Sequence, residues 1–153
     1  MSATCEELIE RAPLVELTAK TKEEALRQLA EAFRGEPKVA NLDRFIEAIF
    51  AREKVISTGI GIGVAVPHVK IPEVSDFVLA FGRHREGLDF DSLDDQPVHL
   101  LAMIGASEAQ AGEFLKMLAR LVRTFRARDV RRKLMQAENA EAFRAVLREN
   151  APK

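Results

Sequence analysis

A histidine follows a proline at the end of an apolar, glycine-rich segment, GIGVAVPHVK (residues 61–70). Neutral imidazole is a nucleophile near pH 7, so this residue, His68, is a candidate to accept and release a phosphoryl group. Pro67 stiffens the backbone before it and has no N–H for a β-ladder, which predicts that a strand ends there. The alternative is a structural histidine whose ring bonds to a neighbouring carbonyl.

The residues before this segment could hold a phosphoryl group on the imidazole. Arg52 supplies a planar cation that can grip two oxygens, and Ser57 and Thr58 supply hydroxyls. Glycines at positions 59, 61 and 63 expose backbone N–H groups. We expect Arg52 and His68 to form the catalytic pair, with Ser57 and Thr58 binding phosphate. Taken singly, an arginine is more often an ion-pair partner, and such hydroxyls are more often turn residues.

The glycines do not form a nucleotide cradle. A dinucleotide fingerprint needs G-x-G-x-x-G, but Val64 stands three residues after Gly61, and Val66 three after Gly63. The chain also has no Gly-Lys-Ser/Thr of a P-loop. We therefore expect no cofactor and predict that phosphate comes from another phosphoprotein or a small donor.

The other two histidines do not repeat this context. His84 stands in a polar segment that predicts a surface turn, and His99 opens a predicted strand, where it would be structural or solvated. No two histidines have the i, i+4 or H-x-H spacing of metal ligands, so we expect no metal. Whether His84 or His99 approaches His68 depends on tertiary folding.

Two charged stretches have plain interpretations. The aspartates of DFDSLDD (residues 89–95) lack the oxygen and glycine pattern of a calcium loop, which predicts a solvated turn. The run RLVRTFRARDVRRK (residues 120–133) has seven basic residues against one aspartate and could face an acidic partner. It lacks the interleaved exposed aromatics of a nucleic-acid groove.

The length and composition of the chain indicate the class of protein in which these residues act. The chain has 153 residues, 47% of them hydrophobic, which predicts a single domain over residues 1–153. Its net charge of −1 argues against a nucleic-acid partner. Cys5 is the one cysteine, and no apolar stretch reaches 18 residues. We expect a cytoplasmic protein without direct membrane insertion.

Helices and strands alternate around the histidine. Residues 21–34 and 41–53 carry apolar residues at helical spacing, with Thr21 and Asn41 as N-caps, and residues 107–125 form the longest predicted helix, opened by Ser107. Short apolar runs at 13–19, 63–69, 76–83 and 98–106 predict strands, and two shorter helices end the chain. The first dozen residues are interpreted as a short acidic lead. The mixture predicts an α/β fold, a mixed β-sheet flanked by helices on both faces.

One stretch resembles a known signature. REKVISTGIGIGVAVPH (residues 52–68) is similar to the active-site region of EIIA domains of the fructose and mannitol class in the bacterial phosphoenolpyruvate-dependent phosphotransferase system, including the nitrogen-regulatory branch. LDFDSLDDQPVHLLAMI (residues 88–104) resembles the next region of that family. The similarity extends over about residues 14–147 and implies the sandwich fold of the family.

The resemblance implies specific roles. His68 matches the histidine that accepts phosphate from the phosphocarrier HPr and passes it to an EIIB domain, and Arg52 matches the arginine beside it. The family commonly has a second, assisting histidine near the start of the long helix, where this chain has Phe114. The resemblance implies a phosphotransferase component, with the apolar ring weakening transfer. The alternative is a phosphorylation-gated regulatory binding module without sustained transfer, acting in sugar transport or nitrogen regulation.

Overall fold

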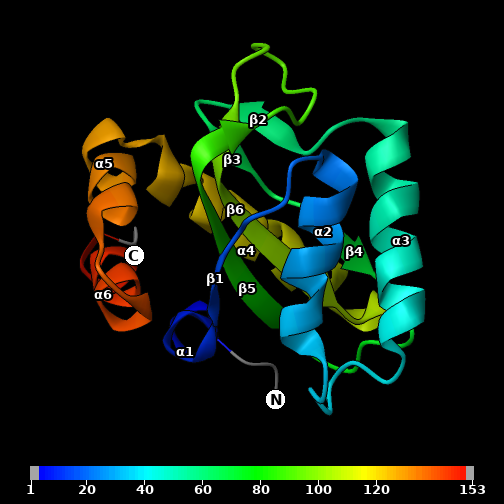
Figure 1. The fold of residues 1–153 in the computed structure, drawn as a ribbon. Coiled ribbons are helices and arrows are strands. Elements are labelled where there is room, and N and C mark those ends of the chain that lie inside the picture. The colour runs from blue at the N-terminus through cyan, green and yellow to red at the C-terminus, as the bar shows by residue number, and fades with distance from the viewer. Residues whose placement is uncertain (1–3, 151–153) are drawn as a thin grey trace.

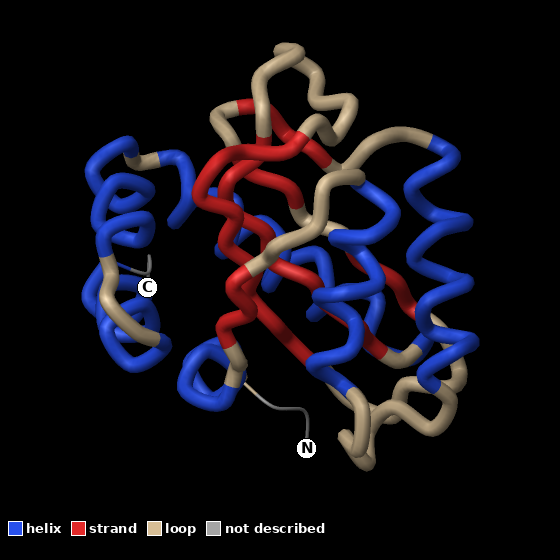
Figure 2. Tube along the Cα trace, in the orientation of Figure 1, coloured by secondary structure: helices blue, strands red, loops and turns tan. Residues whose placement is uncertain are grey.

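Within residues 4–150, which the computed structural model describes, six strands form one mixed sheet (Figures 1 and 2). The strands are β1 (Leu14–Glu16), β2 (Gly59–Gly61), β3 (Val64–Ala65), β4 (His68–Lys70), β5 (Val78–Leu88) and β6 (Val98–Ala106). Their order is β1-β5-β6-β3-β2, and β4 also pairs with β6, beyond the end of β3. The long strands β5 and β6 are antiparallel, whereas β3 and β4 both run parallel to β6.

Helices cover both faces of this sheet, as Figure 1 shows. They are α1 (Cys5–Arg11), α2 (Lys22–Ala30), α3 (Leu42–Val55), α4 (Ala111–Arg126), α5 (Arg128–Gln136) and α6 (Ala140–Asn150), with short 3-10 turns η1 (Glu31–Phe33) and η2 (Glu108–Gln110). Side chains alternate along β6 between the two faces of the sheet. Leu101 and Met103 lie in the core under α2 and α3. Leu100 and Ile104 lie in the core under the other four helices, α1, α4, α5 and α6. The predicted fold class is confirmed.

The predicted helix starts are confirmed at the capping side chains. Thr21 Oγ1 accepts from the Glu24 N–H at 3.2 Å, and Asn41 Oδ1 accepts from the Arg44 N–H at 3.1 Å. Ser107 and Gln110 form a reciprocal capping box at η2, directly before α4. These caps satisfy N–H groups that have no partner within their helix.

Two predictions from the sequence are wrong. The segment taken as an acidic lead contains α1, which Thr4 caps and which buries Leu8 and Ile9 against α6 and the sheet. His84 is not in a surface turn: it lies within β5, is buried, and donates its Nε2–H to the Ala19 carbonyl at 2.7 Å. Both errors have one cause, because charged neighbours hid a buried face whose partner is distant in sequence.

The turn between β2 and β3 has an unusual backbone. Ile62 and Gly63, its two central residues, have φ of 56° and 78°. Positive φ at both positions is the requirement of a type I′ hairpin turn, which normally carries Asn-Gly. The Asp94 carboxylate accepts from the Ile62 N–H at 3.0 Å and so holds the turn against the aspartate-rich loop.

No helix within residues 4–150 is both long and apolar enough to cross a bilayer.

Candidate active site

His68 is the first residue of β4, where it pairs with Ile104 of β6. Its Nδ1 lies 2.6 Å from the Val66 carbonyl oxygen, across the proline that separates the two residues. A carbonyl can only accept, so Nδ1 carries the hydrogen and Nε2 keeps its lone pair. The half-buried ring is thereby fixed in one tautomer, with its free lone pair on Nε2.

The surroundings of His68 favour the neutral ring. Burial lowers the pKa of its imidazole below the ordinary value, and the positive charges of Arg52 and Lys70 lower it further. The hydrogen bond to the Val66 carbonyl and the Glu53 carboxylate act in the opposite direction and do not cancel this lowering of the pKa. Near pH 7 the imidazole is therefore uncharged, as a nucleophile must be.

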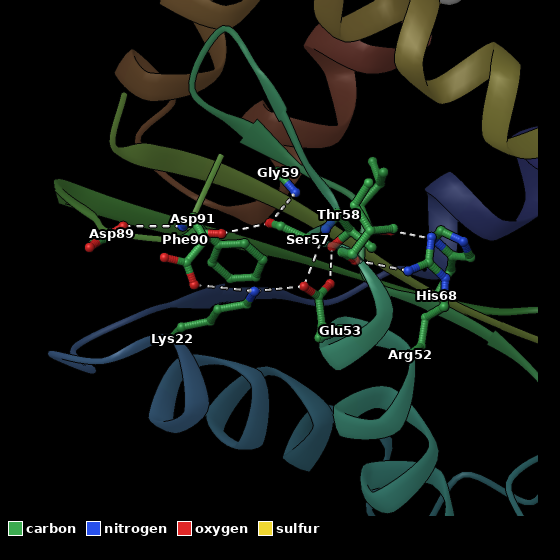
Figure 3. Close-up of polar contacts among 12 residues, drawn as sticks. Lys22, Arg52, Glu53, Ser57, Thr58, Gly59, His68, Asp89, Phe90 and Asp91 are labelled. Atoms are coloured by element: carbon green, nitrogen blue, oxygen red, sulfur yellow. Dashed lines mark hydrogen bonds and ion pairs between the residues drawn. The ribbon is translucent and has the colours of Figure 1, made fainter. Parts of the chain in front are cut away.

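Arg52 lies in the last turn of α3, and its side chain points to the His68 ring (Figure 3). The guanidinium donates from Nη1 to the Ile56 carbonyl at 2.9 Å, which ties it to the segment that leads into β2. Both Arg52 and His68 are partly exposed. The structure thus brings together the two residues that the sequence analysis expected to act as a pair.

Ser57 and Thr58 are close by, but their hydroxyl hydrogens are engaged within the protein. Ser57 Oγ donates to the Phe90 carbonyl at 2.6 Å and accepts from the Gly59 N–H at 3.0 Å. The buried Thr58 donates its hydroxyl to the Glu53 carboxylate. Both hydroxyls hold the loop between α3 and β2 in shape. The direct phosphate binding predicted for them stays a prediction, and it requires a hydroxyl to exchange its partner.

The sequence analysis missed Glu53 and Lys22. Glu53 accepts from the Thr58 N–H at 3.2 Å and lies 2.9 Å from Lys22 Nζ, and both side chains are largely buried (Figure 3). A signal was available, since Glu53 stands four residues after the buried Ile49 and continues the apolar face of α3. A carboxylate on such a face must be paired. This pair joins α2 to α3 and fixes the loop beside Arg52.

Phe114 of α4 packs against the His68 ring. Its ring centroid is 5.4 Å from that of His68, and the residue is 2% exposed. Lys70 Nζ lies 5.6 Å from the same phenyl ring. The side of the imidazole that faces α4 is therefore apolar.

The remaining histidines lie elsewhere. His99 Nδ1 donates to the His84 carbonyl at 3.0 Å, and His99 stands five residues before Ile104 on β6, roughly 16 Å away at the rise of a strand. Neither His84 nor His99 fills the place of the assisting histidine. Within residues 4–150, no three His, Cys, Asp or Glu side chains gather so that they could hold a metal ion.

Comparison with known proteins shows the family of this chain. Residues 8–150 match the family model described as phosphoenolpyruvate-dependent sugar phosphotransferase system, EIIA 2. The chain is 38% identical over 129 residues to the fructose-specific EIIA component of Haloferax volcanii, covering 84% of each protein. It is 34% identical over 134 residues to the fructose-specific EIIABC component of Bacillus subtilis, covering 88% of this chain but 21% of that protein.

A solved structure extends the likeness to three dimensions. The nitrogen regulatory protein IIA-Ntr of Neisseria meningitidis superposes with a TM-score of 0.84 at 32% identity, covering 91% of this chain and 97% of that one. The family model matches residues 8–150, a range that contains all six strands and the segment from Arg52 to His68. The chain belongs to the EIIA family of the phosphoenolpyruvate-dependent sugar phosphotransferase system, the family that includes fructose-specific and nitrogen-regulatory members.

Proposed function

We propose that the protein is a phosphohistidine carrier, which accepts a phosphoryl group on His68 Nε2 from an HPr-like phosphocarrier. The observation that carries the proposal is the hydrogen bond from Nδ1 to the Val66 carbonyl, which leaves Nε2 as the atom with a free lone pair beside Arg52. The lowered pKa of the ring adds to this, because a neutral imidazole is nucleophilic near pH 7.

The transfer is an in-line displacement between two nitrogen atoms. The Nε2 lone pair attacks phosphorus as the bond to the donor histidine breaks, and the donor imidazole keeps that electron pair. Arg52 neutralises charge on the phosphoryl oxygens, and the loop held by Glu53 keeps it in position. In the second step the phosphoryl group leaves Nε2 for an EIIB cysteine, or it remains as a signal. Neither step needs a metal or a nucleotide.

The test is phosphorylation by the purified upstream components. The protein is incubated with phosphoenolpyruvate, the first enzyme of the system and HPr, and its intact mass is measured. We expect a gain of one phosphoryl group in the wild type, no gain in His68→Ala, and slower gain in Arg52→Gln. NMR of the phosphorylated imidazole should show the phosphorus on Nε2. A gain that persists in His68→Ala, or phosphate on Nδ1, would contradict the proposal.

The second candidate is a regulatory module that binds a target according to its phosphorylation state. Phe114 favours it, since a phenyl ring cannot donate a hydrogen bond to a phosphoryl oxygen. Both candidates place the protein in the cytoplasm with a phosphocarrier as donor, and they differ in the second step. Rapid transfer from phosphorylated protein to an EIIB cysteine supports the carrier, whereas retention of the phosphoryl group supports the regulatory module.

A further inference from the structure

A basic cavity lies far from His68, between α5 and the hairpin of β2 and β3. It has a volume of about 330 Å³, and Arg128, Arg131 and Arg132 of α5 line it together with His99 of β6. We call it the α5 cavity. His99 precedes Ile104, the partner of His68, by five residues, so the two places are separated by roughly 16 Å of strand. The cavity is therefore distinct from the candidate active site.

The charge of the α5 cavity is of one sign. None of the described residues that line it carries a carboxylate. Arg131 is held in position because its Nη1 donates to the Phe125 carbonyl at 2.9 Å and to the Arg126 carbonyl at 2.7 Å. Arg132 pairs with Asp129, but both side chains are more than half exposed, so this ion pair is weak and an incoming dianion can displace it.

The His99 ring packs closely against backbone beside this cavity. A Cβ at position 87 would lie 2.8 Å from its Cε1 and 3.0 Å from its Nε2, and one at position 63 would lie 3.8 Å from its Cδ2. Both Gly63 and Gly87 have positive φ, a conformation that favours glycine, and at Gly87 the close approach of the His99 ring also leaves no room for a side chain. The Nδ1 bond to the His84 carbonyl then fixes the ring. His99 is thus oriented by its surroundings.

The rim of the cavity contains a strained residue. Ile62, which is 40% exposed, has a φ of 56°, a conformation that β-branched residues rarely adopt. Residues with such strained backbone conformations are often found at ligand-binding sites, where the surrounding structure maintains them. The wall beneath is apolar, formed by Leu100 and Met135. The cavity therefore combines cationic donors with a surface for a carbon skeleton, at the lower end of the size range of small-molecule sites.

We propose that the α5 cavity binds a small phosphomonoester. Its phosphate dianion lies among the three guanidinium groups, whose planar donors match phosphate oxygens, and its carbon body packs on Leu100 and Met135. A concave place of this size fits a metabolite better than the flat surface of an acidic protein. The site does not depend on phosphorylation of His68.

The experiment is a titration followed by calorimetry and by NMR of the His99 ring and the arginine side chains. The probes are inorganic phosphate, phosphoenolpyruvate, fructose 1-phosphate and AMP. We expect saturable binding of at least one phosphomonoester with a Kd below about 1 mM, the weak end of small-ligand affinity. The double variant Arg128→Gln/Arg132→Gln should weaken it about tenfold or more, since two charge-assisted contacts are lost. Arg131 is left intact because it also caps α4.

Two controls make the outcome decisive. Arg123→Gln/Arg126→Gln removes the same charge from exposed positions of α4 outside the cavity and should leave the Kd within about twofold, as expected for surface charges. His68→Ala should bind as the wild type does. Absence of saturable binding by all four probes, equal weakening in both arginine doubles, or loss of binding in His68→Ala would each overturn the proposal. Binding of an acidic peptide in place of every phosphomonoester would also overturn it.

Discussion

At His68, one backbone carbonyl decides which ring nitrogen can react. The Val66 carbonyl oxygen accepts a hydrogen bond from Nδ1–H of His68. The turn through Pro67 places the two atoms 2.6 Å apart. Partial burial of the ring, followed by the neighbouring charge of Arg52, lowers the pKa of the imidazole and so favours its neutral form. The tautomer is therefore selected by a local hydrogen bond, and the protonation state by the packing around the ring.

This lowered pKa makes the stability of the protein depend on pH. An unfolded histidine binds a proton near its ordinary pKa of about 6.5, but folded His68 resists protonation until a lower pH. The unfolded state then binds more protons, so stability is full above about pH 6.5 and falls as the pH drops below it. We expect His68→Gln to lose less free energy of unfolding than the wild type between about pH 7 and about pH 5.

Urea unfolding at the two pH values measures this difference, and NMR titration of the His68 ring gives its pKa directly. Arg52→Gln removes a positive charge that lowers this pKa, so the titration should move to higher pH in that variant. Equal acid sensitivity of wild type and His68→Gln would show that the ring has an ordinary pKa.

We predict that Phe114 shortens the lifetime of the proposed phosphohistidine, because a phenyl ring offers no hydrogen-bond donor to the phosphoryl group. Phe114→His places an N–H donor in the helix position that now contacts the His68 ring. A charge-assisted hydrogen bond of about 1.5 kcal/mol corresponds to a roughly tenfold longer half-life of the phosphoryl group. Hydrolysis of the phosphorylated protein, followed by mass, is the measurement. Leu115→His is the matched control, since Leu115 is 63% exposed, and its half-life should be unchanged.

Among the elements, α3 carries the residues that serve His68, and its close approach to the sheet depends on one glycine. A Cβ at Gly105 of β6 would lie 2.6 Å from the Phe45 ring of α3 and 2.9 Å from Val78 of β5. Gly105 also pairs with Val69 in β4, next to His68. The absence of a side chain there lets α3 rest on the sheet and brings Arg52 to the rim.

Gly105→Ala should therefore destabilise the protein. Forcing a methyl group into this contact is overpacking, with a cost of about 1–3 kcal/mol in the free energy of unfolding. Gly112→Ala is the control, since a Cβ at that position of α4 meets nothing within 4 Å and should stabilise by up to about 1 kcal/mol. Denaturant titration measures both. A neutral Gly105→Ala would mean that α3 can move outward at no cost.

In the whole molecule, Arg83 fastens the C-terminal helices to the sheet. It is 2% exposed, pairs with Glu16 of β1, and donates from Nη1 to the carbonyls of Leu134 at 2.7 Å and Ala137 at 2.8 Å. Those carbonyls lie at the end of α5 and in the link to α6. One guanidinium on β5 thus satisfies acceptors from two parts of the chain, β1 and the end of α5 with its link to α6, and both are distant from Arg83 in sequence.

Replacing Arg83 should loosen α5 and α6 before the rest of the fold. Arg83→Met leaves two buried carbonyls without a donor, and loss of one partner from a buried network costs about 3–5 kcal/mol. Hydrogen exchange should show the earliest loss of protection in α5 and α6. Arg85→Met is the control, because Arg85 is exposed and should change stability little. Uniform loss of protection across the sheet would contradict this role.

Local patterns were sufficient for the elements that begin at a cap or alternate along a strand. Thr21, Asn41 and Ser107 each start a helical segment as predicted, because a cap needs only residues within one turn. The helix α1 and the buried His84 were not predictable in the same way. Their burial depends on contacts with α6 and with Ala19, far away in sequence.

The order of residues alone was enough to predict that a strand ends at Pro67, directly before His68, and that Arg52 lies in a segment typical of this family. The folded arrangement was needed to show that His68 Nδ1 donates to a carbonyl, that Thr58 donates to Glu53, and that a phenyl ring lies beside the imidazole. The physical reason is that residue types and spacings act over one turn or one strand. The protonation and partners of a side chain depend on whichever elements the pairing of the sheet brings together.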